Sequence, residues 1–365
     1  MSTVRTFLQN DVDRVAELFQ KIFRHGSKPA LAGLKQYFSE LYLQNPAQDG
    51  ECPSLVYEDA GVVRGFIGAI PSRMSYKGKH LRAVIGGNLM IDPEAKNPFA
   101  AVNLLKTFFA GHQDVTLTDT SNEHGRKMWE GLGGVTLPLF TLQWLHVLSP
   151  SRFVLALAGR HGITNALGFG LKPLAPIADS LLRRLLPDGT KSREALYRTE
   201  KLTAKVLLEG IRSMKDQYSF GPDHDEPALA WLLAMARRKK EYGPLEETAL
   251  YDQHGNLAGW YLYYPNAGKV GQVLQVCARR KDAAGVLHNL FEDARAKGTA
   301  ALIGRADPSM MLELSVQHSM FFQRNVYVQV KSESPDVVQA LMNGDAFFTR
   351  LEGEWWTRLQ GDKFE

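Results

Sequence analysis

A run of residues around position 90 combines the features of a phosphate-binding turn. Two glycines, Gly86 and Gly87, lie inside a predicted strand that ends at Asp92. A loop follows, and a helix is expected to open with Asn97 as its N-cap and Pro98 in its first turn. Unpaired backbone N–H groups at such a helix start bind anions. The segment therefore predicts a site for a phosphorylated ligand, and the glycine pair predicts a bulge that separates this strand from its neighbour.

A second motif starts at Asn122 and continues through Gly125, Met128 and Trp129 to Gly133. An asparagine, a small residue, an apolar–aromatic pair and a glycine at this spacing resemble the GCN5-related N-acetyltransferase family, in which they follow a strand–loop–helix like the one described above. In that family the loop at the helix start holds the pyrophosphate of acyl-CoA, and the pantetheine lies between two diverging strands. The resemblance therefore implies an acyl-CoA site.

The sequence also indicates an internal duplication. Residues 56–71 align without a gap on residues 250–265, and residues 115–119 match residues 300–304. In both copies an antiparallel hairpin is followed by alternating strands and helices, which predicts a mixed sheet. We therefore expect an α/β fold with two sheets of the GCN5-related type, each flanked by helices.

Three parts are predicted along the chain. Residues 1–149 form an N-terminal unit of the GCN5-related type, which is the favoured acyl-CoA site. Residues 150–205 form a helical connector that is both basic and apolar, and residues 206–365 form a degenerate second unit. In the second unit, small residues at the expected loop would admit a pyrophosphate, but Asp282 at the helix start would repel it.

The donor-binding residues are predicted from the resemblance, on the first unit. They lie on the strand end, in the loop and on the two helix starts. The set is Met90, Ile91, Lys96, Asn97, Phe99, Ala100, Ala101, Asn122 and Trp129.

The first unit departs from the family at both usual proton carriers. The strand carboxylate that often serves as general base is replaced by Asn88, and an amide takes no proton near neutral pH. The tyrosine that often protonates the departing thiolate is replaced by Trp129, whose indole N–H does not ionise. In addition, Phe99 replaces a loop glycine, and its side chain narrows the space over the helix start.

Other groups are therefore predicted to act in catalysis. A backbone N–H near Met90 or Ile91 is placed to polarise the thioester carbonyl. Asp119, at the end of the next strand, is the first candidate base, with Glu123 as the second. Asn122 completes the candidate catalytic set. The alternative for Asp119 is a structural role, in which it caps the turn into the helix at Asn122.

Composition limits the class of protein. Among 365 residues, 43 are basic and 39 acidic, a net charge of +4 that does not predict nucleic-acid binding. Only two cysteines occur, so neither a disulfide framework nor a cysteine metal site is expected, and Asp223-His224-Asp225 is interpreted as a helix cap. The longest apolar run, residues 153–159, is too short to span a bilayer, and the first residues carry no apolar leader. A cytoplasmic location is expected.

The predicted function is direct transfer of an acetyl or longer acyl group from acetyl-CoA, or another acyl-CoA, to a primary amine. The acceptor is a small molecule or a peptide, and neither a metal nor a covalent acyl-enzyme is expected. One alternative is a non-catalytic tandem protein that binds CoA or a partner. Another is a membrane-surface scaffold, with a peripheral lipid contact through residues 150–205, where residues 179–186 form an amphipathic stretch with a basic edge.

Overall fold

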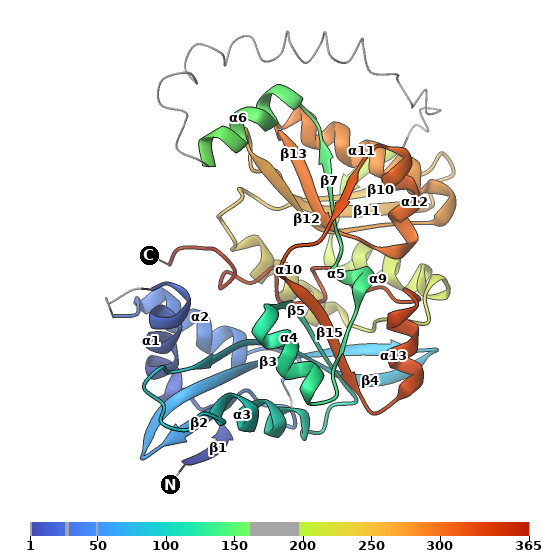
Figure 1. The fold of residues 1–365 in the computed structure, drawn as a ribbon. Helices are drawn as coiled ribbons and strands as arrows, with labels where there is room; N and C mark the ends of the chain where they lie inside the picture. The colour runs from blue at the N-terminus through green and yellow to red at the C-terminus, as the bar shows by residue number, and fades with distance from the viewer. Residues whose placement is uncertain (1, 26–28, 49, 161–196, 365) are drawn as a thin grey trace.

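Two mixed β-sheets organise the chain, one above the other in Figure 1. The structure is a computed structural model that describes residues 2–25, 29–48, 50–160 and 197–364. The predicted α/β class, with two mixed sheets flanked by helices, is confirmed. Most of the predicted connector, including the amphipathic stretch at residues 179–186, lies outside the described residues.

The first sheet is built mainly from the N-terminal part of the chain. Its strand order is β1 (Ser2–Thr6), β2 (Leu55–Asp59), β3 (Val62–Tyr76), β4 (Lys79–Ile91), β5 (Val115–Ser121), β15 (Tyr327–Ser332) and β6 (Val135–Thr136), and β9 (Phe220–Pro222) pairs with β3.

The second sheet is built mainly from the C-terminal part. Its order is β8 (Arg198–Lys201), β10 (Glu246–Tyr251), β11 (Leu257–Tyr264), β12 (Val270–Ala278), β13 (Ala301–Arg305), β7 (Gln143–Val147) and β14 (Met320–Phe322).

The two sheets share one plan and exchange a strand. In each, an antiparallel run ends in one parallel pair, β4 with β5 and β12 with β13. The strand beyond that pair comes from the other half of the chain. Thus β15 lies against β5 in the first sheet, whereas β7 lies against β13 in the second (Figure 1). Strand pairing therefore crosses the predicted boundaries, and the division at residues 149 and 206 stays a prediction.

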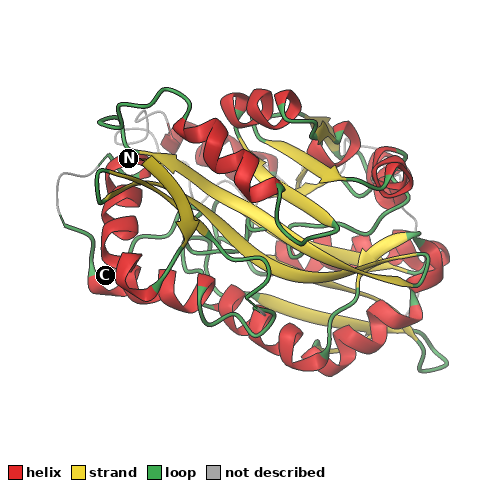
Figure 2. Cartoon of the chain, turned by 90° about the horizontal axis from the view of Figure 1, so that it is seen from below, coloured by secondary structure: helices red, strands yellow, loops and turns green. Residues whose placement is uncertain are grey.

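Helices flank both sheets (Figure 2), and α9 and α10 lie between the two sheets in Figure 1. The apolar residues Val12, Val15, Leu18 and Phe19, which recur at helical spacing, are buried on one side of α1. The helices are α1 (Val12–Phe23), α2 (Ala32–Tyr42), α3 (Ala100–Phe109), α4 (Glu123–Gly131), α5 (Pro138–Thr141), α6 (Pro150–Arg160), α9 (Ala204–Ser213), α10 (Glu226–Arg237), α11 (Ala283–Ala296), α12 (Met311–Val316) and α13 (Pro335–Met342). Short 3₁₀ turns lie at Gln9–Asp11, Lys215–Gln217, Arg280–Asp282 and Pro308–Met310.

The last described segment, residues 343–364, contains no helix or strand, yet it is largely buried between the two sheets. Two cations hold its backbone in place. The Lys239 ammonium donates to the carbonyl oxygens of Trp355, Thr357 and Gln360, and the Arg24 guanidinium donates to three carbonyl oxygens at residues 359–362. We call residues 343–364 the tail. Along this path, the tail brings the Glu354 side chain against β4 of the first sheet.

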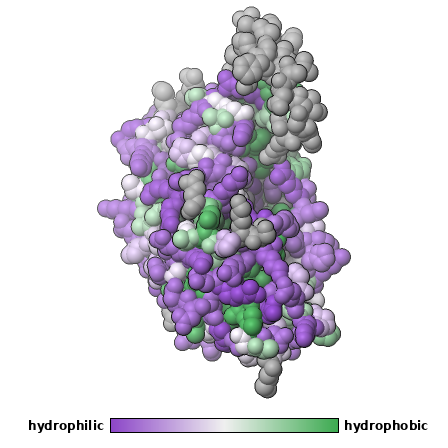
Figure 3. Space-filling view, turned by 90° about the vertical axis from the view of Figure 1, so that its left-hand side faces the viewer, coloured by the Kyte–Doolittle hydropathy of each residue, from purple (hydrophilic) through white to green (hydrophobic). Residues whose placement is uncertain are grey.

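Within the described part of the chain, no helix combines the length and apolar character needed to cross a bilayer. The face drawn in Figure 3 is mostly hydrophilic, with hydrophobic residues in small separate patches.

Candidate functional site

The first sheet opens between β4 and β5. The two strands pair only through Ala83, Val84 and Ile85 of β4, and they diverge beyond that point. The predicted bulge lies just after the pairing ends. The register of β4 against β3 shifts at Asn88, whose φ of 52° is left-handed. The glycine pair thus marks a bulge and a splayed strand, as predicted.

A cleft of about 720 Å³ occupies the opening between the two strands. Its walls come from β4, β5, α1, the start of α4 and the tail, so the second half of the chain helps to close it. Among the predicted donor-binding residues, Ile91, Ala101, Asn122 and Trp129 line this cleft.

The other predicted donor-binding residues lie around the cleft without lining it. Met90 is buried in the main apolar core, and Ala100 is buried beneath the start of α3. Lys96 and Phe99 are exposed, and Asn97 is half-buried in the loop.

Helix α3 begins two residues later than predicted. The first helical residue is Ala100, and the Asn97 side chain accepts the Phe99 N–H at 2.9 Å before the helix starts. The N–H groups of Ala101 and Val102 have no acceptor within the described residues. Such free groups at the start of a ten-residue helix make an anion site. Phe99 is 65% exposed, so its ring leaves this site open.

The side chains that lie against Gly86 and Gly87 explain why both positions are glycine. A Cβ on Gly86 would contact the Phe108 ring at 2.9 Å. A Cβ on Gly87 would overlap the carboxyl group of Glu354, which the tail brings against β4. Glycine at position 87 therefore makes room for an acidic side chain from the end of the chain.

Glu354 is fully buried beside the cleft. It accepts a hydrogen bond from the Asn88 amide at 3.2 Å and another from the Thr120 hydroxyl, and both of these residues line the cleft. The Asn88 amide also donates to the Tyr42 hydroxyl at 2.9 Å, which fixes its orientation. Burial, aided by the nearby charge of Asp119, raises the pKa of Glu354 to about 8. A carboxyl group with this pKa suits proton transfer near neutral pH.

Asp119 links the first sheet to the second sheet and to the tail. Its carboxylate is buried, forms an ion pair with Arg305 of β13, and accepts the Glu354 backbone N–H at 2.8 Å. The carboxylate predicted as the base is therefore already engaged by a cation. It does not line the cleft, and it does not cap the turn at Asn122.

The remaining catalytic candidates lie at the start of α4. Asn122 caps the helix by accepting the Gly125 N–H at 2.9 Å. The guanidinium of Arg126 lies 2.6 Å from Glu123 and lowers the pKa of that carboxyl to about 2. Glu123 is thus a weak proton acceptor. The structure brings Asn122 to the cleft wall, whereas it engages both carboxylates in ion pairs.

The second unit is closed where the first is open. The guanidinium of Arg350, from the tail, donates to the carbonyl oxygens of Val273 on β12 and Ile303 on β13, which fills the gap between these strands. At the start of α11, the Tyr197 ring covers Gly285, and Asp282 is paired with Arg279 at 2.7 Å. Both the strand gap and the helix start are thus occupied by the chain itself.

Sequence reasoning missed Glu354, Thr120 and Tyr42. No local pattern distinguishes Glu354, which stands between glycine and tryptophan in an irregular segment. The one available signal was Gly87, because a glycine inside a strand often marks the close approach of another group.

Replacing Gly87 with alanine tests this contact. The added methyl group would displace the Glu354 carboxyl from its place beside Asn88. We expect kcat to fall by about 10-fold or more, since a small displacement of a catalytic group is costly, while acyl-CoA binding changes little. The matched control is Gly131→Ala, because a Cβ there meets open space. Equal activity of the two variants, measured by steady-state kinetics, would contradict a role for Glu354.

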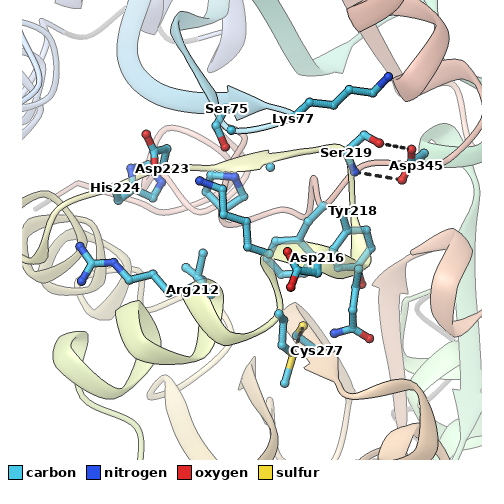
Figure 4. Close-up of a pocket in the computed structure, with 18 of the residues that line it drawn as sticks. Ser75, Lys77, Arg212, Asp216, Tyr218, Ser219, Asp223, His224, Cys277 and Asp345 are labelled. Carbon is cyan, nitrogen blue, oxygen red and sulfur yellow. Dashed lines mark hydrogen bonds between the residues drawn. The ribbon is translucent and has the colours of Figure 1, made fainter.

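A larger cavity, of about 820 Å³, lies elsewhere between the units (Figure 4). Arg212 of α9 and Lys77 of the β3–β4 hairpin lie at its walls, and Ser219 donates two hydrogen bonds to Asp345 there. It does not include the splayed strands or the start of α3. In the described part of the chain, no group of three potential ligands could hold a metal ion.

Solved structures of similar fold cover most of the chain. A GCN5-related N-acetyltransferase from Anabaena variabilis superposes with a TM-score of 0.61 at 10% identity, over 91% of this chain and 73% of its own. A protein from Enterococcus faecalis described as a probable N-acyltransferase gives 0.59 at 11% identity, with the same coverage. A GCN5-related N-acetyltransferase from Kribbella flavida gives 0.56 at 11%, over 90% and 70%. No protein-family model and no curated protein matches the sequence. At these identities the likeness establishes a shared fold.

Proposed function

We propose that this chain, which has the fold of the GCN5-related N-acetyltransferases, is an acyl-CoA-dependent N-acyltransferase. The observation that carries the proposal is the cleft between β4 and β5. It extends from Ala101, at the free N–H groups of α3, to Thr120, which is hydrogen-bonded to the buried carboxyl of Glu354. A phosphate site at one end and a proton acceptor at the other are what acyl transfer from CoA requires.

The donor lies along this opening. Its pyrophosphate binds the N–H groups of Ala101 and Val102, and the pantetheine follows the unpaired edges of β4 and β5. The thioester then lies near the bulge at Asn88. A backbone N–H of the splayed strand, near Met90 or Ile91, polarises the thioester carbonyl.

The acceptor amine attacks the thioester carbon, and a tetrahedral intermediate forms. The amine proton passes to the Thr120 hydroxyl as that hydroxyl delivers its own proton to the ionised carboxylate of Glu354. The C–S bond then breaks, and CoA departs as a thiolate that is protonated from solvent. Glu354 takes the part first predicted for Asp119, because it carries the raised pKa whereas Asp119 is paired with Arg305.

This mechanism predicts a defined pH dependence. Glu354 accepts a proton only when it is ionised, so kcat/KM should rise with pH and level off above about pH 8, where its pKa lies. Ionisation of the acceptor amine also raises the rate with pH. The assignment therefore depends on comparison with Glu354→Gln, in which the step near pH 8 should disappear while the step of the amine remains. The same step in both proteins would assign it to the amine alone.

The overall activity is tested by the release of free CoA thiol from acetyl-CoA and from a long-chain acyl-CoA, with a panel of primary amines. We expect release that depends on the amine, accompanied by amide product identified by mass spectrometry. Binding of CoA without turnover of any donor–acceptor pair would instead favour a non-catalytic protein that binds CoA.

A further inference from the structure

A small cavity borders the cleft at Thr120. It measures about 210 Å³, and it shares Thr120 and Gln360 with the cleft wall. Both units contribute to it, since its lining includes Asp119 and Phe140 from the first half of the chain and Tyr242 from the second. Because Thr120 borders both spaces, a molecule in this cavity would face a thioester across the hydroxyl that contacts Glu354.

Three arginines line this cavity, which we call the arginine cavity: Arg305, Arg324 and Arg350. Asp119 is the single carboxylate among the described residues that line it, and it is already paired with Arg305. The charges of Arg324 and Arg350 are therefore left without a carboxylate in the cavity wall.

Arg350 is a buried cation with neutral partners. Its side chain is 4% exposed, and its Nη1 donates to the Gln272 side chain at 3.1 Å and to the carbonyl oxygens of Val273 and Ile303. Burial, together with the charge of Arg305 and the smaller effect of Arg324, lowers the pKa of Arg350 to about 9. A bound anion would relieve the unfavourable positive potential that these effects reflect.

Aromatic side chains lie against Arg350 and Arg324. The Arg350 guanidinium lies 4.4 Å from the centre of the Trp355 ring, and Trp355 stacks in turn on Tyr242 at 5.8 Å. The Arg324 guanidinium lies 5.4 Å from the Phe322 ring. Arginines that are already ordered lose little entropy when they bind a planar, two-oxygen anion.

We infer that the arginine cavity binds the anionic end of the acceptor, and that the acceptor is a small primary amine that carries a carboxylate, of the size of an amino acid. The carboxylate binds Arg324 and Arg350, and the amine points toward Thr120. This inference rests on the proposed function, because it assigns the acceptor of that reaction. The small volume of the cavity favours a compact molecule over a polymer.

The test compares matched acceptors at saturating acetyl-CoA, with CoA release as the readout. The pairs are glycine with glycinamide and L-phenylalanine with L-phenylalaninamide, and 2-aminoethyl phosphate is a separate acceptor. We expect kcat/KM to be about 10- to 100-fold higher for each carboxylate than for its amide, because the amide lacks the charged group that accepts hydrogen bonds from the arginines. The amides have the less basic amines, so amine ionisation cannot produce this preference. Preference for the phosphate would overturn the assignment to a carboxylate.

The variant that completes the test is Arg324→Gln. Arg324 is exposed, so its replacement should leave the fold intact. We expect the ratio of kcat/KM for each carboxylate to kcat/KM for its amide to fall by about 10-fold or more. The control is Arg212→Gln, at the wall of the cavity drawn in Figure 4. If Arg212→Gln removed the preference and Arg324→Gln did not, the acceptor would bind in that other cavity and the inference would be wrong.

Failure of the inference differs from failure of the proposed function. Equal turnover of amides and carboxylates would remove the anionic acceptor and leave acyl transfer in place. No CoA release with any amine would remove the proposed function itself.

Discussion

Replacing Glu354 with glutamine should lower kcat by about 10²- to 10³-fold and leave the affinity for acyl-CoA nearly unchanged, because general-base catalysis contributes about 10²–10⁴-fold in enzymes. The amide is the same size as the carboxyl. Its oxygen can accept from Asn88, and its NH2 group can donate to the Thr120 hydroxyl, which then acts as the acceptor. The proton acceptor alone is lost. Steady-state kinetics, together with calorimetric titration of acetyl-CoA, separates the two effects.

Whereas kcat of Glu354→Gln should fall, the stability of this variant relative to the wild type should increase as the pH rises. The pKa of Glu354 is about 8 in the folded protein, against an ordinary value of 4.5, so between these pH values the folded state binds more protons than the unfolded state. The contribution of Glu354 to stability is therefore fully present below about pH 4.5 and is lost as the pH rises toward 8. Glutamine does not titrate, so the Tm of Glu354→Gln relative to the wild type should increase across this range.

The control for this variant is Glu352→Gln. Glu352 is also a buried carboxyl of the tail, but it accepts hydrogen bonds from Gln275, at 2.8 Å, and from Thr349, on the side of the second unit. We expect its replacement to keep kcat within about twofold of the wild type, since its hydrogen bonds go to Gln275 and Thr349 and not to the cleft residues Asn88 and Thr120. If both variants lost activity equally, the tail would matter only as a structural element and Glu354 would not be the base.

The second large effect is expected from Ala101→Glu. Ala101 is in the first turn of α3, next to the free N–H groups, and it lines the cleft. A glutamate there favours the helix, because it interacts well with the helix dipole, but it repels a pyrophosphate. We therefore expect acetyl-CoA to bind about 100-fold more weakly or not at all, with an unchanged or slightly higher Tm of the free protein. Calorimetric titration measures the first quantity and thermal unfolding the second.

A matched substitution exists in the second unit. Ala284 is the second residue of α11, as Ala101 is of α3. Because Tyr197 and the pair of Arg279 with Asp282 already occupy that helix start, Ala284→Glu should not affect donor binding. If Ala284→Glu abolished binding and Ala101→Glu did not, the donor would belong to the second unit.

Features set by local sequence were predicted well. The pair Gly86 and Gly87 indicated the bulge because a glycine inside a strand often marks a bulge or the close approach of another group, here Phe108 and Glu354. Asn122 was placed at the start of α4 by its spacing to Gly125, Met128 and Trp129 in the family motif, and in the structure it caps that helix by accepting the Gly125 N–H. The predicted start of α3 was two residues too early, because the Asn97 side chain forms a turn of its own before the helix.

Features set by contacts between distant segments were not predicted. Glu354 is 266 positions from Asn88 along the chain, and no periodicity relates the two. The exchange of β7 and β15 between the sheets likewise depends on the whole fold. Asp119 was chosen as a base because it ends a strand next to the predicted site, but its ion pair with Arg305 of the other unit could not be seen from the sequence. The contribution of the tail to the candidate site, through Glu354, was therefore not predicted from the sequence.

The central claim, that the cleft of the first sheet binds an acyl-CoA, is tested most directly by thermal unfolding of the full chain with CoA, acetyl-CoA and a long-chain acyl-CoA. A ligand that binds the folded state stabilises it by about 2.7 kcal/mol at a hundredfold excess over its Kd. We expect at least one acyl-CoA to raise the Tm of the wild type and of Ala284→Glu by several degrees, but not that of Ala101→Glu. An unchanged Tm of the wild type with all three ligands would contradict it.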